Sequence, residues 1–318
     1  MPQISVLGIG FAGLDIIKNG TDELILPGGT CGNVISILAS KFSLKADIIK
    51  SAYSDDWDDV VNCLWKQIGV GVINCGDAAK PLPRVVEVVN GTSNQQYTIC
   101  PKCKSKLLDI SLPATNKLND LEDTLSRYDL LYYDRISEGT KYLLDNFRRN
   151  KKWSFYEPNS ARNYNNWLKN ISQCDVVKFS EDRIPRSFRD KLLQDLNMME
   201  RKTRIVLITH SQRGYSYSIF NGKCMSDLRT INVSKFTNIV DSSGAGDWLS
   251  AGFIYKLLQN YSTPIEIVDE QVIIDALEFG HSLAKIACTN LGALGEIFRT
   301  QSYQITESKY KCDFCKLQ

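Results

Sequence analysis

Short apolar strands alternate with helical stretches through most of this chain, and this alternation restricts its fold more than any other feature. Apolar runs lie at 130–133, 153–156, 176–179 and 205–209, and the segments between them include stretches of helical spacing such as 140–149. Strands connected through helices run parallel and are covered on both faces of their sheet. The sequence therefore predicts one α/β domain over residues 1–318, with a mostly parallel central sheet flanked by helices.

Composition and charge are those of an ordinary globular protein. The 318 residues are 43% hydrophobic and 23% charged, and a net charge of +2 gives no electrostatic reason to expect nucleic acid or an anionic membrane as a partner. No apolar stretch approaches the roughly 20 residues of a membrane-spanning helix. The N-terminal residues lead directly into a strand. We therefore expect a cytoplasmic protein.

Two regions outside this alternation have strand signals. Residues 84–89 and 95–99 alternate between apolar and polar around Asn90-Gly91-Thr92-Ser93, which predicts a β-hairpin. A further β pair is predicted at 215–220 and 224–228. These strands would form a small β appendage and an antiparallel edge.

Glycines near the N-terminus match the G-x-G-x-x-G pattern of dinucleotide-binding proteins, at Gly8, Gly10 and Gly13. That pattern requires a full helix directly after the glycines. Only residues 14–19 separate Gly13 from Gly20, which leaves no room for the helix. A dinucleotide site is therefore not expected.

The segment Asp241-Ser242-Ser243-Gly244-Ala245-Gly246-Asp247 has the features of an anion-binding turn. It follows the apolar residues 238–240, interpreted as a strand end, and precedes a predicted helix whose buried face carries Leu249, Phe253, Leu257 and Tyr261. Backbone amides at a glycine-rich helix start suit a phosphate, and Asp247 would lie within reach as a base. The alternative is a glycine-rich turn in which Asp247 only stabilises the helix N-terminus.

The block from Asp241 to Phe253 resembles the C-terminal motif D-T-x-G-A-G-D-x-F-x-x-G-F of the ribokinase-like (PfkB) family of sugar and nucleoside kinases, with Ser242 and Leu249 as replacements. Gly28-Gly29 followed by Asn33 is similar to the family's N-terminal G-G-x-x-x-N. The resemblance extends from residue 4 to about residue 298.

This resemblance implies a Rossmann-like sheet, with a small β lid from about 11–26 and 84–115, and an enzyme that uses ATP with Mg²⁺. Asp247 would be the base, and the amides of Gly244, Ala245 and Gly246 the anion hole. The acceptor would contact Asp15, Gly28, Gly29, Asn33, Arg135, Asn159 and Arg162; the nucleotide would contact Ser180, Thr209, Gly214, Asn290 and Gly292; and a monovalent cation such as K⁺ would bind near Asp241 and Ser243.

Two family motifs are altered. The N-x-x-E motif that organises Mg²⁺ should fall near residues 177–183, where Ser180 occupies the Asn position and Arg183 the Glu position. The nucleotide loop T-x-G-x-x-G appears at 209–214 without its first glycine. These changes weaken the metal assignment without removing the anion hole or the base.

The segment Glu157-Pro158-Asn159-Ser160-Ala161-Arg162, with Trp167, resembles the D-x-N-x-R…W segment of ketodeoxygluconate- and fructokinase-type members. Ligands of open α/β sheets bind at this end of the strands, but an ordinary polar loop is the alternative. Arg135 ends another strand and is a weaker member of the same pocket. His281, inside an apolar helix, is expected to be a packed core residue.

The chain has ten cysteines, of which four form the pairs Cys100-Pro-Lys-Cys103 and Cys312-Asp-Phe-Cys315. Two C-x-x-C pairs in a reducing compartment fit a tetrahedral zinc site, joined within one chain or across a homodimer formed through the lid. Thiols without metal are the alternative. The other six are expected to be small buried apolar residues: Cys31, Cys63, Cys75, Cys174, Cys224 and Cys288.

Three functions remain open from the sequence. The first is an ATP-dependent kinase that phosphorylates a hydroxyl of a small sugar or sugar acid. The second is a nucleoside kinase of the same fold, which aromatic residues such as Phe11, Trp57 or Tyr97 could serve by stacking on a base. The third is a catalytically silent binding or regulatory protein, favoured by the altered motifs and opposed by the intact Gly244–Asp247 block.

Overall fold

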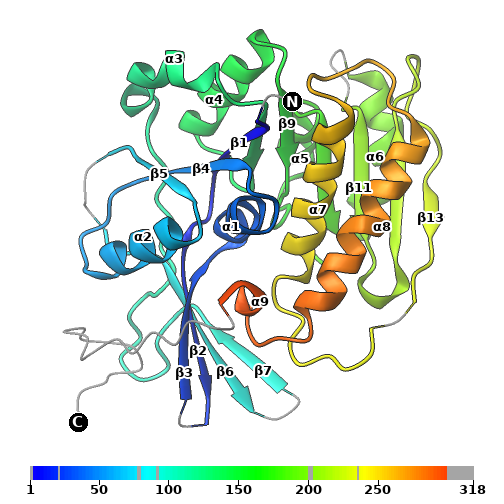
Figure 1. Cartoon of the computed structure of the whole chain (residues 1–318). Helices are drawn as coiled ribbons and strands as arrows, with labels where there is room; N and C mark the ends of the chain where they lie inside the picture. The colour runs from blue at the N-terminus through cyan, green and yellow to red at the C-terminus, as the bar shows by residue number, and fades with distance from the viewer. Residues whose placement is uncertain are drawn as a thin grey trace.

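A nine-stranded, mostly parallel sheet forms the centre of the molecule (Figure 1). The computed structural model describes residues 3–20, 22–76, 80–90, 93–199, 203–234 and 236–298. The tail at 300–318, with Cys312 and Cys315, lies outside the described residues. Within the described part, the strand order is β13-β12-β11-β10-β9-β8-β1-β4-β5. Its strands are β1 (Ser5–Ile9), β4 (Lys45–Lys50), β5 (Gly71–Asn74), β8 (Leu130–Tyr133), β9 (Trp153–Tyr156), β10 (Val176–Ser180), β11 (Ile205–Thr209), β12 (Tyr215–Ile219) and β13 (Arg229–Ile231).

The predicted parallel arrangement is confirmed from β5 to β11, and β12 pairs antiparallel with both β11 and the edge strand β13. Both faces of the sheet are buried, because alternate residues of a strand enter different cores. In β1, Val6 belongs to one hydrophobic cluster and Leu7 to the other. This explains why the central strands are continuous apolar runs rather than alternating ones.

Helices cover the two faces in two groups. One cluster contains side chains of α1 (Thr30–Phe42), α2 (Trp57–Gln67), α7 (Ala245–Asn260) and α8 (Glu270–Ala287). The other contains side chains of α4 (Glu138–Arg149), α5 (Tyr164–Ile171) and α6 (Arg186–Met198). The remaining short helices are α3 (Glu122–Leu125), α9 (Gly295–Phe298) and 3₁₀ turns at Thr115–Lys117, Asn119–Leu121 and Ser211–Arg213.

A second sheet of four strands extends from the body near α9 (Figure 1). It has the order β3-β2-β6-β7, with β2 (Gly13–Asn19), β3 (Asp22–Gly28), β6 (Arg84–Asn90) and β7 (Ser93–Tyr97). β2 and β6 pair parallel, and the other pairs are antiparallel. Gly13 begins a strand, so these glycines are not followed by the helix that the dinucleotide pattern requires.

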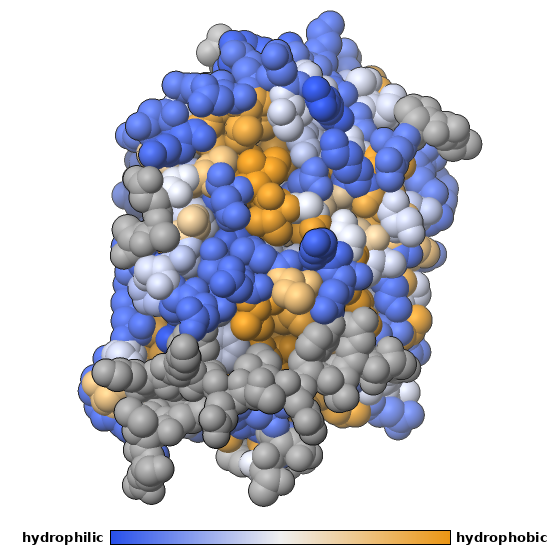
Figure 2. All heavy atoms as spheres, turned by 60° about the vertical axis from the view of Figure 1, so that its left-hand side comes forward, coloured by the Kyte–Doolittle hydropathy of each residue, from blue (hydrophilic) through white to orange (hydrophobic). Residues whose placement is uncertain are grey.

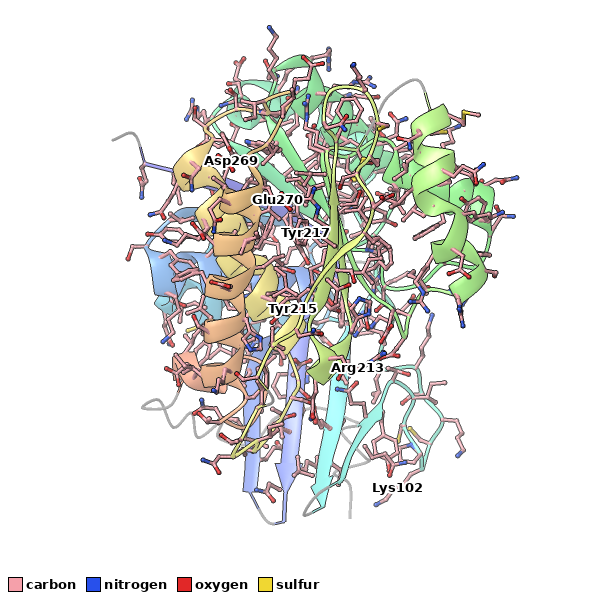
Figure 3. The ribbon with its side chains drawn as sticks, turned by 90° about the vertical axis from the view of Figure 1, so that its right-hand side faces the viewer. Lys102, Arg213, Tyr215, Tyr217, Asp269 and Glu270 are labelled. Carbon is pink, nitrogen blue, oxygen red and sulfur yellow. The ribbon has the colours of Figure 1, made fainter. Side chains whose placement is uncertain are left out.

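Strand β12, which lies beside the edge strand β13, is joined to α8 through two tyrosines (Figure 3). Tyr217 Oη donates to Glu270 Oε1 at 2.6 Å, and Tyr215 Oη contacts His281 Nδ1. The start of α8 is capped by Asp269, whose carboxylate accepts from the Gln271 amide at 2.8 Å. These contacts fix α8 against the antiparallel edge of the sheet.

Two predicted strands are wrong. Residues 238–240 form a loop in which Ile239 and Val240 are 40% and 58% exposed, and the Val240 amide donates to the Cys288 carbonyl rather than to a strand. Residues 224–228 contribute only one bridge, between Phe220 and Met225, and the paired strand is β13. Ile239, Val240 and Leu228 are exposed, whereas Met225 is buried in the core.

The buried-cysteine expectation holds for four of the six scattered residues. Cys63 and Cys224 are exposed, because Cys63 lies on the polar side of α2 and Cys224 in the turn after β12. His281 is also misassigned, since it is partly exposed and lines a cavity.

Within the described residues, no helix is long and apolar enough to cross a membrane. On the face shown in Figure 2, apolar residues gather in a band down the middle, with hydrophilic residues on either side.

Candidate active site

The glycine-rich turn before α7 leaves backbone amides pointing away from the helix. Gly244 has φ of +76°, and a side chain there would collide with Ala293, so glycine is required. The Ala245 amide donates to the Ser242 carbonyl at 3.2 Å. The Gly244 and Gly246 amides have no hydrogen-bond partner within the described residues. Two unpaired amides at the positive end of a helix dipole can receive an anion.

The N-terminal and C-terminal motifs meet at Asp247. Asn33, in the first turns of α1, is buried and donates from Nδ2 to Asp247 Oδ2 at 2.7 Å. The turn before α1 contains Gly29 at φ +85°, where a side chain would strike the Phe11 carbonyl. The amide of Asn33 thus holds one carboxylate oxygen of Asp247 beside the anion-binding turn.

The pKa of Asp247 is raised from 3.8 to about 7, mainly by burial and then by the nearby carboxylate of Glu157. The Asn33 hydrogen bond and the charges of Lys178 and Arg183 oppose this rise in pKa. A carboxylate with a pKa near 7 is a stronger base than an ordinary aspartate and still ionised in part at neutral pH.

A buried ion pair between Lys178 and Glu157 contacts the start of α7, directly after the anion-binding turn. Lys178 Nζ, on β10, donates to Glu157 Oε1 at 2.5 Å, to the Gly246 carbonyl at 2.9 Å and to Ser250 Oγ at 2.7 Å. Glu157 Oε2 accepts from Ser250 at 2.6 Å and from Tyr132 at 2.9 Å. The sequence analysis missed this pair. The signal for it was a lysine inside an apolar strand, which is costly unless the charge is paired.

The small sheet turns one polar face toward the turn. Asp15, Glu87 and Gln96 share a face of β2, β6 and β7, and all three line the cavity. Glu87 is buried and accepts from Ser243 Oγ at 3.3 Å, so the sheet contacts the anion-binding turn directly. Burial raises the pKa of Asp15 to about 8, and the charges of Glu87 and Asp247 contribute to this rise.

Arg135 and Asn159 close the same end of the cavity. Arg135 forms an ion pair with buried Asp134 at 3.0 Å and lies 6.0 Å from the centre of the Phe11 ring. Asn159 Oδ1 accepts from Arg183 at 2.8 Å. Arg183 therefore extends from the altered N-x-x-E segment toward the acceptor side.

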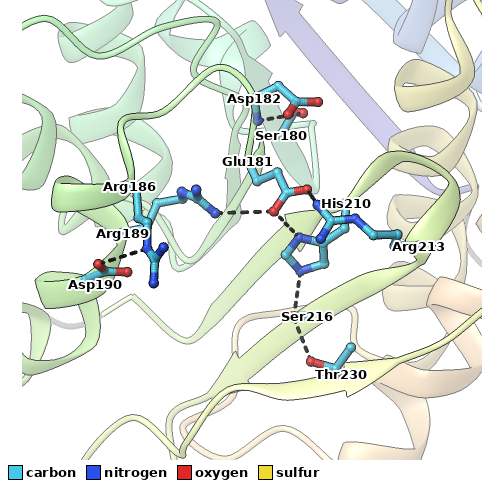
Figure 4. A network of polar contacts seen from close by, with 10 residues as sticks. All are labelled: Ser180, Glu181, Asp182, Arg186, Arg189, Asp190, His210, Arg213, Ser216 and Thr230. Carbon is cyan, nitrogen blue, oxygen red and sulfur yellow. Dashed lines mark hydrogen bonds and ion pairs between the residues drawn. The ribbon is translucent and has the colours of Figure 1, made fainter.

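Glu181 is held in a network of its own (Figure 4). Its carboxylate accepts from Arg189 at 3.4 Å, contacts His210 Nδ1 at 2.8 Å and pairs with Arg213. Arg213 is thus paired with Glu181. Asp182 takes no part in the network and lines the cavity.

The other end of the cavity is more apolar. Tyr215, Phe236, Ile239 and Ala284 line it together with His281. Burial lowers the pKa of His281, so the ring is neutral at physiological pH. A flat heterocycle would suit such a lining.

Most of the predicted site residues share one cavity of about 750 Å³. Its lining includes Asp15, Gly29, Asn33, Arg135, Asn159, Ser180, Thr209, Ser243, Gly244, Ala245, Gly246 and Asp247. The predicted residues that do not line it are Gly28, Arg162, Gly214, Asp241, Asn290 and Gly292.

Three of these six residues, Gly28, Asp241 and Gly292, lie just outside the cavity lining. Gly28 lies against the Asp15 carboxylate, and Asp241 accepts from the amides of Ser243 and Gly292, both at 2.8 Å. Arg162 is exposed outside the cavity. Of the two predicted residues of this loop, Asn159 therefore lines the cavity and Arg162 does not.

Cys100 and Cys103 lie beyond β7, away from this cavity. Within the described residues, no group of three or more His, Cys, Asp or Glu side chains is arranged to hold a metal ion. The two remaining cysteines of the predicted zinc site lie outside those residues.

Known structures share this architecture at low sequence identity. Ribokinase from Giardia lamblia matches with a TM-score of 0.73 and 16% identity, covering 91% of this chain and 96% of that chain. Adenosine kinase from Schistosoma mansoni, in complex with 2-fluoroadenosine, matches with a TM-score of 0.73 and 13% identity, covering 92% and 97%. Fructokinase from Vibrio cholerae, bound to fructose, ADP and potassium ion, matches with a TM-score of 0.65 and 16% identity, covering 92% and 94%.

Comparison with curated protein sequences finds no match. The structural similarities establish a ribokinase-like fold, as predicted. The model of the pfkB family of carbohydrate kinases matches residues 27–297. Since this match covers most of the sequence, the chain belongs to the pfkB carbohydrate kinase family and is a phosphotransferase.

Proposed function

We propose that this enzyme transfers the γ-phosphoryl group of ATP to a hydroxyl of a small sugar or sugar acid, with Asp247 as the base. The observation that carries this proposal is the contact of Asn33 with Asp247 beside the free amides of Gly244 and Gly246. Phosphoryl transfer needs in-line positioning, charge stabilisation and a proton acceptor, and these groups lie in one cavity.

A polar acceptor fits the cavity better than a nucleoside. Of the three aromatic residues that could stack on an acceptor base, only Phe11 lines the cavity; Trp57 is fully buried elsewhere. Asn33 Oδ1 is buried and has no hydrogen-bond partner within the described residues. It can accept from an acceptor hydroxyl, and Asp15 can accept from others. This lining favours a molecule with several hydroxyl groups.

ATP would lie between the turn and the apolar end of the cavity. The adenine would contact the surfaces of Tyr215 and His281, and Ser180 and Thr209 line the path toward the turn. Mg²⁺ would neutralise charge on the phosphates. Asp182 is the carboxylate of the altered segment that faces the cavity, because Glu181 is engaged by His210 and two arginines.

Arg183 replaces the family's metal-organising glutamate with a positive charge. Its guanidinium donates to Asn159 Oδ1, and the residue lines the cavity. Its positive charge lowers the pKa of Asp247. We propose that it binds a phosphate oxygen during transfer. Arg183→Gln should lower kcat by about tenfold or more. Arg213→Gln is the matched control, since Arg213 is exposed and bound to Glu181. Equal losses in the two variants would contradict this role.

A monovalent cation is also proposed beside Asp241. Both oxygens of this buried carboxylate accept backbone amides, so its negative charge is held in the loop that leads into the anion-binding turn. A cation there would stabilise the loop that leads into the anion-binding turn.

The test of the main proposal is ATP consumption with sugars, sugar acids and nucleosides as acceptors. Acceptor-dependent ADP formation that Asp247→Asn abolishes, without loss of ATP binding, would support the kinase. Tight ATP binding without turnover on any acceptor would instead favour the catalytically silent binding protein.

A further inference from the structure

The wall that the small sheet contributes to the cavity is acidic. Asp15 on β2 and Glu87 on β6 lie on the same face, because Asp15 is level with Val85, two positions before Glu87. All three residues line the cavity. Among the described residues with which this sheet lines the cavity, none is a lysine or an arginine. A molecule bound against this wall therefore meets two carboxyl groups and no positive charge from the sheet.

The carboxyl group of Asp15 has no protein partner. Within the described part of the chain it makes no hydrogen bond and no ion pair. Burial raises the pKa of Asp15 to about 8, and the charges of Glu87, Asp247 and Asp241 all add to this rise. Carboxylates gathered in this way cannot all ionise at neutral pH unless a positive charge joins them. Asp15 thus faces the cavity without the partner that a buried carboxylate normally has.

An independent observation indicates a ligand rich in hydrogen-bond donors. Asn33 is 4% exposed and lines the cavity, and its Nδ2 is used by Asp247. Its Oδ1 is buried and has no hydrogen-bond partner among the described residues. Asn33 Oδ1 and an ionised Asp15 can only accept hydrogen bonds. An ammonium group has three donors and no acceptor, so it matches this lining and also offsets its negative charge.

The positive charge is not supplied by the side chains around the acceptor. Arg135 is paired with Asp134 at 3.0 Å, and Lys178 is paired with Glu157. A bare metal ion does not suit the wall either, since no three His, Cys, Asp or Glu side chains in the described ranges are arranged to hold one. An organic cation can contact carboxylates that do not surround a single point. The missing charge is therefore best supplied by the acceptor itself.

We propose that the acceptor is an amino sugar or a related amino polyol, whose ammonium group binds at Asp15 and Glu87 while one of its hydroxyl groups faces Asp247. This inference rests on the proposed kinase function and narrows its acceptor. The acceptor oxygen forms a bond to the γ-phosphorus, its proton passes to Asp247, and the bond between that phosphorus and the bridging oxygen breaks to leave ADP. The ammonium group only holds the acceptor. A sugar acid would instead bring a further negative charge to this wall.

Matched acceptors test the proposal directly. Glucosamine, N-acetylglucosamine, glucose and glucuronate share one skeleton and differ in charge, and the galactose and mannose series offer the same comparison. Binding is measured by calorimetry, and turnover by ADP formation. In at least one series the amine should bind about tenfold tighter than its N-acetyl and hydroxyl forms, and the carboxylate should bind weakest. An amine that binds no tighter than its N-acetyl form in every series overturns the proposal.

Variants locate the ammonium group. Asp15→Asn keeps the size of the side chain and removes its charge, so the preference for the amine over the hydroxyl form should fall about tenfold, with ATP KM little changed. Glu87→Gln should act in the same direction. Glu23→Gln, at an exposed acid of β3 outside the cavity, is the matched control and should keep the preference. A preference that survives both Asp15→Asn and Glu87→Gln overturns the assignment to this wall.

Failure of this inference and failure of the kinase proposal give different results, because calorimetry needs no turnover. Amine-selective binding without ADP formation on any acceptor would overturn the kinase and leave the acidic wall as an amine site. Turnover that prefers a neutral or an acidic sugar would support the kinase and overturn the amine.

Discussion

Replacing Asp247 with asparagine should abolish phosphoryl transfer and at the same time stabilise the fold. Asparagine can still accept the hydrogen bond from Asn33, but it cannot take a proton from a hydroxyl. Loss of a positioned base should reduce kcat by about 10²- to 10⁴-fold. The stabilising effect follows from the pKa of Asp247, which is about 7 in the folded protein against 3.8 for an ordinary aspartate.

The size and the sign of this stabilisation depend on pH. Because the folded state keeps its proton to higher pH than the unfolded state, the ionised carboxylate destabilises the fold as pH rises from about 4 to about 7. At about 1.4 kcal/mol per pH unit, the destabilisation is on the order of 2 kcal/mol at pH 5 and 4 kcal/mol at pH 8. Asparagine removes the destabilisation at both pH values, so the gain in stability should be roughly 2 to 3 kcal/mol larger at pH 8.

Thermal unfolding of wild type and Asp247→Asn at the two pH values measures this difference. At roughly 2 °C per kcal/mol for a chain of this length, the variant's advantage in Tm should grow by about 5 °C from pH 5 to pH 8. Asp120→Asn, at an exposed aspartate, is the matched control and should show no such trend. A Tm gain that is equal at both pH values would refute the buried-charge reasoning, and a variant with near wild-type turnover would refute the role of base.

Three further outcomes are expected. Asn33→Ala should raise the pKa of Asp247, because it removes a hydrogen bond to the ionised form, so the acidic limb of the kcat/KM profile should move to higher pH; an unmoved limb would contradict the contact. Lys178→Met should lower the free energy of unfolding by about 3–5 kcal/mol, because it leaves Glu157 charged and buried, and adding Glu157→Gln should recover most of that loss in urea titrations. Replacing K⁺ by tetramethylammonium at constant ionic strength should reduce kcat, and equal rates in both salts would argue against the cation site.

The sequence predicted those parts of the site that depend on local backbone. The turn before α7 was recognisable because Gly244 and Gly246 precede an apolar helical face, and the strands were recognisable as continuous apolar runs. The family resemblance assigned Asn33 and Asp247 to one site, but not the hydrogen bond between them, which joins residues 214 positions apart.

The remaining features depend on strand order and side-chain direction, which a single sequence does not specify. Lys178 and Glu157 pair because β9 and β10 are neighbours, and Glu181 is captured by His210 because β11 lies next to β10. Arg162 lies in the same loop as Asn159, but its side chain is exposed and does not line the cavity. The apolar run at 238–240 was predicted as a strand from its composition. In the structure its backbone instead bonds to the end of α8, where the Val240 amide donates to the Cys288 carbonyl.

The contact between Glu87 and Ser243 couples the position of the small sheet to the order of the anion-binding turn. Glu87 belongs to the small sheet, and Ser243 to the turn that would receive the phosphate. Any outward movement of the sheet breaks this contact and also separates Ile17 from Gly292, whose amide is bound to Asp241. In an open enzyme, ATP would be exposed to water, but the anion-binding turn would be less ordered. Because this turn stabilises the transferred phosphate, hydrolysis of ATP in the absence of an acceptor would be slow. In this way the sheet, whose Asp15 and Glu87 line the cavity, would also protect the phosphate donor until an acceptor is in place.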